Sequence, residues 1–262
     1  MHTREEKMEA FGRLLDVMDN LREKCPWDRK QTFESLRPNT IEEVYELADA
    51  IVKSDLHNVS KELGDVLLHI VFYAKLGEEK NDFDIKDVCD KLCEKLIYRH
   101  PHVYGNTKAE TAGDVVKSWE LLKMKEKDGN KSVLSGVPDA LPSVIKSYRI
   151  QDKARNVGFD WEKKEQVWDK VLEEFNELQA EIDAMDKEKM EKEFGDLFFS
   201  IINAARLYHI NPDTALELTN RKFINRFNYL EEHTIKQGRD LKTMTLAEMD
   251  ELWEEAKKLE KK

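Results

Sequence analysis

The sequence is poor in residues that interrupt regular structure and in residues that form cross-links. It has only 10 glycines, 6 prolines and 3 cysteines among 262 residues. Sheets need frequent turns and β-branched runs, so this scarcity, together with 37% charged and 40% hydrophobic residues, favours amphipathic helices. Three cysteines argue against a disulfide framework and indicate a reducing compartment. Cys89 and Cys93 lack a second pair that would complete a zinc site, so we predict them to be core residues.

Long apolar runs and a surplus of positive charge are also missing. No run of 18 apolar residues occurs, and the first residues lack the apolar stretch of a signal peptide, so we expect a cytoplasmic protein without membrane contact. The 54 acidic residues exceed the 43 lysines and arginines, which gives a formal net charge of -11. Nucleic-acid binding needs a basic surface, so we expect no nucleic-acid partner. An anionic ligand would need metal ions or a local group of cations.

The apolar residues recur with helical periodicity along most of the chain. In the first half this pattern predicts a helix around 11–21, one that begins after Thr40 as N-cap and runs to about Lys53, and further helices over about 56–75, 84–100 and 114–127. The polar stretch 127–132 reads as a linker. In the second half helices are predicted over about 142–156, 165–185, 187–209, 212–237 and 246–259.

The second half repeats the first. The pattern Glu-Glu-x-x-Glu at 42–46 and the pattern Glu-x-Gly-Asp at 62–65 both recur 131 residues later, at 173–177 and 193–196. A Lys-x-x-x-Arg pair at 95–99 recurs at 222–226, and Trp119 and Trp253 occupy matching places in the last helix of each half. A repeat of this length indicates duplicated domains rather than a solenoid. We therefore predict an all-α fold with domains at 1–128 and 138–262, joined by a linker at 129–137.

The repeated acidic residues predict a metal site in each half. Residues three apart share one helix face, and the short connection predicts that the two helices pack as antiparallel neighbours, so four carboxylates should face one another. Their repulsion would be relieved by a hard divalent cation such as Mg²⁺. The predicted ligands are Glu43, Glu46, Glu62 and Asp65 in the first half and Glu174, Glu177, Glu193 and Asp196 in the second.

Two simpler interpretations compete with a metal site. An acidic chain can contain one Glu-Glu-x-x-Glu by chance, and Glu43 could serve a capping box with Thr40. Against both, the spacing of 19 residues from Glu43 to Glu62 is kept from Glu174 to Glu193. Each copy also keeps a mid-helix glycine, at 64 and 195, which costs about 1 kcal/mol relative to alanine and suggests close approach of backbone or ligand.

The paired cations indicate what a metal site would bind. Lys95 and Arg99 share a helix face, as do Lys222 and Arg226. Alone, such pairs are usually solvated surface residues. Beside metal-bound carboxylates they suit a polyphosphate, because lysine supplies a point charge and arginine a bidentate fork.

Together these motifs resemble the MazG family of nucleoside triphosphate pyrophosphohydrolases, in its two-domain form, over nearly the whole chain. The most specific stretches, besides the two carboxylate sets, are Cys25-Pro26-Trp27-Asp28, the run from His100 to Gly105, Lys222-Phe223-x-x-Arg226-Phe227 and Glu251-Leu252-Trp253. The resemblance implies an all-α NTP pyrophosphatase that depends on Mg²⁺, with Mn²⁺ as an alternative. It also implies a homodimer.

The resemblance further implies roles for individual residues. The eight predicted carboxylates would bind metal, Lys222 and Arg226 would hold the phosphates, and Trp253 would lie at the nucleotide site. The accessory phosphate-binding residues would be Lys170, Lys189 and Lys192, with Lys95 and Arg99 as first-half counterparts of the main pair. Asn39 and Asn58 stand where the repeat would place Lys170 and Lys189, so we expect the main activity in the second half.

The expected reaction is attack of a metal-bound water on the α-phosphorus, which releases pyrophosphate. Either Glu173 or Glu174 would act as general base, and helical spacing does not distinguish them. A di-iron oxidoreductase is a weaker alternative, because that class uses Glu-x-x-His on two helices. His69 lies near the first set of carboxylates, but its repeat equivalent is Ser200. A second alternative is a nucleotide-binding or oligomerisation module without turnover in one half, most plausibly the first.

Overall fold

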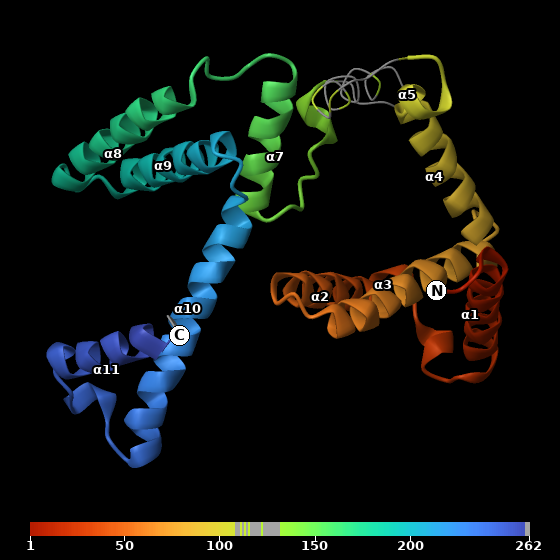
Figure 1. Ribbon diagram of the computed structural model, residues 1–262, viewed down its shortest axis with the longest axis horizontal. Helices are drawn as coiled ribbons and strands as arrows, with labels where there is room; N and C mark the ends of the chain where they lie inside the picture. Colours follow the sequence, from red (N-terminus) through yellow and green to blue (C-terminus); the bar gives the residue numbers. More distant parts are fainter. Residues whose placement is uncertain (108–110, 112, 114, 116–121, 123–131, 260–262) are drawn as a thin grey trace. The chain divides into compact units, whose positions relative to one another are not determined.

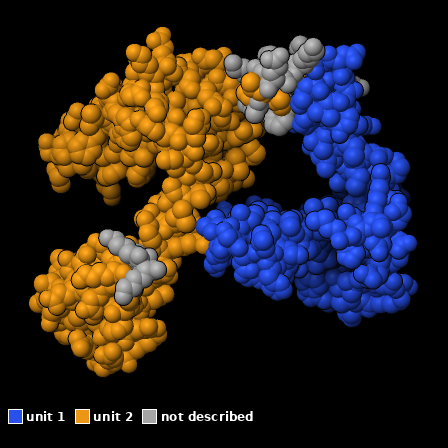
Figure 2. Space-filling model, viewed as in Figure 1, with its two compact units in different colours: residues 1–109 blue, residues 110–262 orange. Residues whose placement is uncertain are grey.

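The computed structural model describes residues 1–107, 111, 113, 115, 122 and 132–259, and these contain helices and no strand. The predicted all-α class is therefore confirmed. The chain divides into two compact units, residues 1–109 and 110–262 (Figure 2). The helix predicted over 114–127, Trp119 and the polar stretch 127–132 lie, apart from isolated residues, outside the described part. The predicted domain boundaries therefore stay a prediction.

The first unit is built around one pair of long helices. Its elements are α1 (Arg4–Lys24), η1 (Asp28–Lys30), α2 (Phe33–Val52), α3 (Leu56–Glu79), α4 (Ile85–Arg99) and α5 (Pro101–Tyr104). Three residues connect α2 to α3, and the two helices pack along each other as predicted (Figure 1). Helix α1 packs against α3, and α4 leads from the end of α3 to α5.

The apolar faces of α1, α2 and α3 meet in the core of this unit. Met18, Leu36, Val71, Phe72 and Leu76 form one cluster, and each exposes 4% or less of its surface. The spacing from Val71 to Phe72 and Leu76 follows the i, i+1, i+5 positions of one helix face. This cluster fixes α1 against the α2–α3 pair.

The second unit repeats the helix pair. Its elements are η2 (Leu134–Gly136), α7 (Ser143–Asn156), η3 (Lys164–Gln166), α8 (Val167–Asp183), α9 (Lys187–Leu207), α10 (Pro212–His233), η4 (Ile235–Gln237), η5 (Leu241–Thr243) and α11 (Leu246–Leu259). Helices α8 and α9 correspond to α2 and α3, and α7 packs against α9. Helix α10 leads from the α8–α9 pair to α11, which packs against it (Figure 1).

The predicted start of α2 is wrong. Thr32, and not Thr40, is the N-cap, and it forms a reciprocal capping box with Ser35. The helix therefore begins before Pro38 and includes it, although proline has no backbone N–H to donate. The Thr40 hydroxyl lies inside the helix, 3.0 Å from the Leu36 carbonyl oxygen to which it donates and 2.7 Å from the Tyr73 hydroxyl. Glu43 consequently lies in mid-helix and has no capping role.

Two further expectations need correction. Cys89 and Cys93 are exposed on α4 and are not core residues, because α4 packs against its neighbours mainly at its ends. Gly64 and Gly195 have no atom within 4 Å of an added Cβ outside their own helix segments, so close backbone approach does not explain them. All three cysteines are free thiols, as predicted. None of the described helices is long and apolar enough to cross a bilayer.

Replacing Phe72 with alanine should lower the free energy of unfolding by about 3–5 kcal/mol, because it empties the centre of the first core. Urea unfolding followed by circular dichroism measures this. Met8, 63% exposed on α1, provides the control, and Met8→Ala should change stability by less than about 0.5 kcal/mol. Equal losses in the two variants would contradict the assignment of the core.

Candidate functional site

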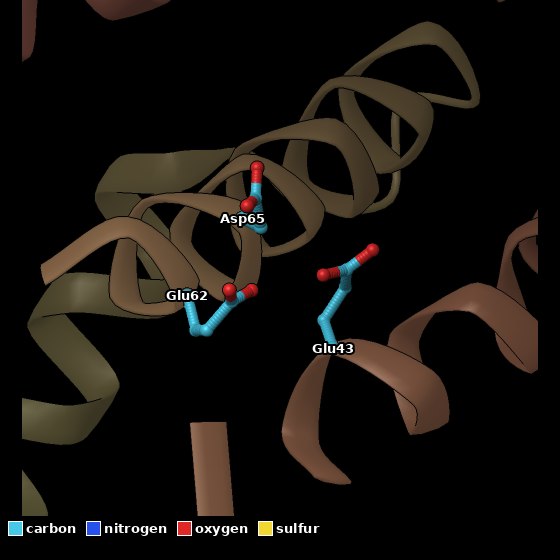
Figure 3. A group of neighbouring side chains, drawn as sticks. All are labelled: Glu43, Glu62 and Asp65. Carbon is cyan, nitrogen blue, oxygen red and sulfur yellow. The ribbon is translucent and has the colours of Figure 1, made fainter. Parts of the chain in front are cut away.

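The first helix pair brings three of its four predicted carboxylates together. Glu43 extends from α2 towards Glu62 and Asp65 on α3 (Figure 3). One oxygen of each lies within 4.8 Å of the others. Glu62 is buried and the other two are half-buried. Glu46 is near enough for its charge to act on Glu43, although it does not belong to this group of three.

The electrostatics of this cluster fit a divalent cation. Burial raises the pKa of the Glu43 carboxyl, and the charges of Asp65, Glu46 and Glu62 raise it further. Glu62 accepts a hydrogen bond from Lys61 at 2.9 Å through Oε1, while its buried Oε2 has no hydrogen-bond partner. A buried carboxylate oxygen without a partner is costly, and a bound cation would satisfy it.

The second helix pair forms a similar cluster from a different subset. Glu174 and Glu177 on α8 and Glu193 on α9 each place one oxygen within 4.8 Å of the others. Burial raises the pKa of the Glu193 carboxyl, and the charges of Glu177 and Asp196 add to this. Asp196 also lines a cavity of about 670 Å³ beside the cluster. Three of the four predicted carboxylates of this half therefore converge, and Asp196 is near enough for its charge to act on Glu193.

One predicted cation lies directly at the second cluster. Lys170 binds Glu174 at 2.6 Å and Glu173 at 2.9 Å, and these two hydrogen bonds raise the pKa of its ammonium group. Lys170 also lines the adjacent cavity. It thus holds a positive charge between the carboxylates and the cavity.

The other predicted cations of this half are not at the cluster's centre. Lys189 lies 3.6 Å from Glu181 and 3.5 Å from Asp186, at the turn between α8 and α9. Lys192 binds Glu188 at 3.0 Å, and both side chains are exposed. Their predicted contact with phosphate stays a prediction.

Lys222 and Arg226 lie on α10, which leaves the α8–α9 pair (Figure 1). At 1.5 Å per residue, Lys222 is about 15 Å beyond the start of α10. Arg226 lies over the Trp253 ring at 5.8 Å, and Phe223 contacts the same ring edge-on at 5.1 Å. The predicted phosphate and nucleotide residues of the C-terminal end thus gather on the α10–α11 pair, separate from the carboxylates of α8 and α9.

The corresponding cations of the first half also lie on a departing helix. Lys95 and Arg99 are on α4, which leads away from the α2–α3 pair towards α5 (Figure 1). Their relation to the first cluster therefore parallels that of Lys222 and Arg226 to the second. The two halves therefore share both the Lys/Arg motif and its position on a helix that leads away from the carboxylate pair.

His69 is not part of the first carboxylate cluster. Its Nδ1 lies 3.0 Å from the Thr40 hydroxyl, and its ring packs near Tyr73. Burial lowers the pKa of this imidazole. A packed, hydrogen-bonded histidine is typical of a residue with a structural role and gives no support to a di-iron centre.

The family model for the MazG nucleotide pyrophosphohydrolase domain matches this chain twice, at residues 31–104 and 162–230. The chain belongs to the MazG nucleotide pyrophosphohydrolase family. Both matches cover a helix pair with its carboxylates. The resemblance and the tandem duplication predicted from the motifs are thereby confirmed.

Two named relatives match the chain along almost its full length, and a third matches a little more than half of it. A Thermotoga maritima protein named nucleoside triphosphate pyrophosphohydrolase/pyrophosphatase MazG is 44% identical over 250 residues, covering 94% of this chain and 95% of that protein. The nucleoside triphosphate pyrophosphohydrolase of Escherichia coli K12 is 38% identical over 260 residues, covering 97% and 99%. A Mycobacterium tuberculosis protein of the same name is 36% identical over 151 residues, covering 56% and 46%. The chain is an enzyme of this family.

In metal-free protein, Glu193→Gln should increase stability at neutral pH. The pKa of Glu193 is raised in the folded state, so its contribution to stability is present below the unfolded pKa and is lost as the pH rises through the folded value. A neutral amide avoids that loss, and the difference from wild type should vanish below about pH 4. Urea midpoints in chelator from acid to neutral pH test this. Glu191→Gln, on the exposed side of α9, should show no such pH dependence.

Proposed function

We propose that the protein hydrolyses nucleoside triphosphates, or deoxynucleoside triphosphates, to the monophosphate and pyrophosphate, mainly in its second half. The convergence of Glu174, Glu177 and Glu193 beside Lys170 carries this proposal. The family and the names of its full-length relatives support the reaction type. The free cysteines agree with a cytoplasmic location.

The predicted metal would occupy the carboxylate clusters. A bound Mg²⁺, or Mn²⁺ in its place, would neutralise phosphate charge and lower the pKa of a water molecule. The buried, unpartnered oxygen of Glu62 and the raised pKa of Glu193 are what such an ion would relieve. Exposed Asp196, beside the cavity, adds the fourth carboxylate of the second set.

The chain's own groups supply the remaining chemistry. Water attacks the α-phosphorus, the bond from that phosphorus to the bridging oxygen breaks, and pyrophosphate leaves with the electron pair. Because Glu174 belongs to the converging group, we assign proton acceptance to the neighbouring Glu173. Lys170, which binds both carboxylates, orients them and offsets phosphate charge.

The site is completed by a second copy of the chain. Lys222, Arg226 and Trp253 lie on the α10–α11 pair, away from the α8–α9 carboxylates, although phosphate binding needs both. The helix surfaces also carry large exposed apolar side chains, which are typical of association surfaces. They include Leu172 and Phe175 on α8, Phe194 and Phe198 on α9, and Leu216 and Phe223 on α10. A homodimer would cover them.

For the first half we propose a metal-binding scaffold with little turnover. Its carboxylates converge, but Asn39 and Asn58 replace Lys170 and Lys189. Its groove of about 680 Å³ is bordered by acidic residues such as Glu46, Asp49 and Glu62, with Lys53 and Lys61 as its cations. Acidic residues outnumber the lysines in this groove, so it should attract a negatively charged triphosphate tail less strongly than the second half does.

Glu174→Gln should reduce pyrophosphate release by about 100-fold or more, because one proposed metal ligand and one of the two carboxylate partners of Lys170 are lost together. The matched variant Glu43→Gln, at the same repeat position in the first half, should keep most of the activity. Pyrophosphate release from a panel of NTPs and dNTPs, with and without Mg²⁺, measures both.

The two variants also separate the competing assignments. Circular dichroism confirms folding of each. Full activity of Glu174→Gln combined with loss in Glu43→Gln would move the chemistry to the first half. Activity in both, and in the double variant, would refute the carboxylate site.

Mixing two inactive variants should restore activity if the site is shared between copies. Glu174→Gln removes one carboxylate of the cluster, and Lys222→Ala removes one of the phosphate-binding cations. Refolding the two together should give heterodimers with one intact composite site, and thus about a quarter of wild-type activity for random pairing. No recovery, with dimers verified by sedimentation, would show that each chain uses its own Lys222.

A further inference from the structure

The chain itself closes one end of the α8–α9 pair and leaves the other end open. Residues 184–186 connect α8 to α9 in a short turn. At the opposite end, the loop 157–166 leads into α8, and α9 ends at Leu207 (Figure 1). Between the two ends lie the carboxylates of Glu174, Glu177 and Glu193, which repel one another. The open end therefore needs a contact that keeps the two helices together.

A buried ion pair supplies this contact. Arg206, near the end of α9, donates to both carboxylate oxygens of Asp160, at 3.1 and 2.5 Å. Its Nε and Nη2 also donate to the side-chain oxygen of Asn203, at 3.0 and 2.8 Å. The side chains of Arg206 and Asp160 are only 3% and 20% exposed, and a two-pronged contact of this kind fixes their relative orientation. The loop that leads into α8 is thereby attached to α9.

Weaker contacts continue from this loop into the first turn of α8. The indole N–H of Trp168 donates to the Tyr208 hydroxyl at 3.1 Å, and the Lys164 ammonium lies 4.9 Å from the centre of the Tyr208 ring. Trp168 is 47% exposed, so water competes for its hydrogen bond. The position of this turn therefore depends more on the buried ion pair than on these surface contacts.

The first turn of α8 carries the cation of the carboxylate site. Lys170 lies three residues after Val167, where α8 begins, and its ammonium binds Glu174 at 2.6 Å and Glu173 at 2.9 Å. A shift at the start of α8 would move Lys170 and both glutamates relative to Glu193 on α9. Such shifts matter, because a misplacement of about 1 Å can reduce an enzymatic rate by about 100-fold.

The first half makes the same connection with different residues. Arg22 on α1 binds Glu79, at the end of α3, through Nε at 2.8 Å and also through Nη2. Its Nη1 donates to the carbonyl oxygen of Asp28, in the loop that leads into α2. The residues 131 positions before the second-half pair are both cations, Arg29 and Lys75, so the pair itself is not repeated. A connection that is kept while its residues differ indicates that both helix pairs need it.

We propose that the Asp160–Arg206 pair positions the carboxylate site, because it holds the open end of α8–α9 together and so keeps Lys170 aligned with the carboxylates. The proposal rests on the proposed function of the second half. Burying an aspartate and an arginine costs desolvation that offsets much of their attraction, so the pair contributes geometry more than stability. Neither residue belongs to the group of converging carboxylates, and both act through the position of α8.

Asp160→Asn in the full-length enzyme with Mg²⁺ tests this pair, because asparagine keeps the size of aspartate and removes its charge. We expect kcat for pyrophosphate release to fall by about tenfold or more, since Lys170 and the carboxylates lose their alignment. KM should change less than kcat, because Lys222 and Arg226 are on α10 and keep their places. Asp160→Glu retains the charge and should recover most of the lost kcat.

Glu79→Gln, in the first half, is the matched control. It removes the carboxylate that Arg22 binds and should lower the urea midpoint as Asp160→Asn does. Its kcat should equal that of wild type, because we place the main activity in the second half. Equal losses of kcat in the two variants would assign the effect to general stability and overturn the proposal. Both residues of the pair line the cavity, so a raised KM with unchanged kcat in Asp160→Asn would indicate substrate binding and also overturn it.

Hydrogen exchange followed by mass spectrometry gives a readout that does not depend on catalysis. In Asp160→Asn the amides of residues 171–174, whose carbonyl partners lie in the first turn of α8, should exchange faster than in wild type. Amides beside the turn at 184–186 should exchange as in wild type. Unchanged exchange at both ends would overturn the proposal.

The exchange measurement also separates this proposal from the proposed function. If wild type releases no pyrophosphate, the hydrolase function is refuted, and faster exchange at the open end alone still shows that the pair holds α8 to α9. If Asp160→Asn does not fold, Arg206→Lys takes its place in all measurements. Lysine keeps the buried charge but lacks the fork that binds both oxygens of Asp160, so the same losses are expected.

Discussion

Repulsion between carboxylates held across a helix pair is the constraint around which each half is built. In water these charges would move apart, but the short connections and packed faces of α2–α3 and α8–α9 keep oxygens of three carboxylates in each half within 4.8 Å of one another. Burial and the neighbouring negative charges together raise the pKa values of Glu43 and Glu193. The fold thus keeps an arrangement that is unfavourable without a cation, as functional sites often do.

Much of this could be predicted from the sequence because it depends on helical periodicity. Spacing of three residues places Glu43 with Glu46, and a short connection brings Glu62 opposite. The errors arose where tertiary packing overrides local signals. Thr40 looked like an N-cap, but the capping box at Thr32 starts the helix earlier. Cys89 looked like a core residue, but α4 lacks a partner along its length within the described unit.

The remaining features depend on contacts between distant segments. Lys170 and Asp196 line the cavity beside the second cluster from two different helices, so no local pattern marks the cavity. The direction in which α10 leaves α9 decides where Lys222 lies, and spacing along the chain does not encode it. Aligning the two halves shows that Asn203 stands where the first half has Phe72. Only the fold shows that Phe72 fills a core and that Asn203 lines a cavity.

The packed core around Phe72 in the first unit and the cavity lined by Asn203 in the second also give the two units different sources of stability. Apolar side chains fill the core of the first unit around Phe72, whereas the side chains that line the cavity of the second unit lack packing partners on one side. A ligand that enters only the folded second unit adds its binding free energy to that unit alone. If nucleotide binds the second unit alone, it should raise the unfolding temperature of that unit and leave that of the first unit unchanged.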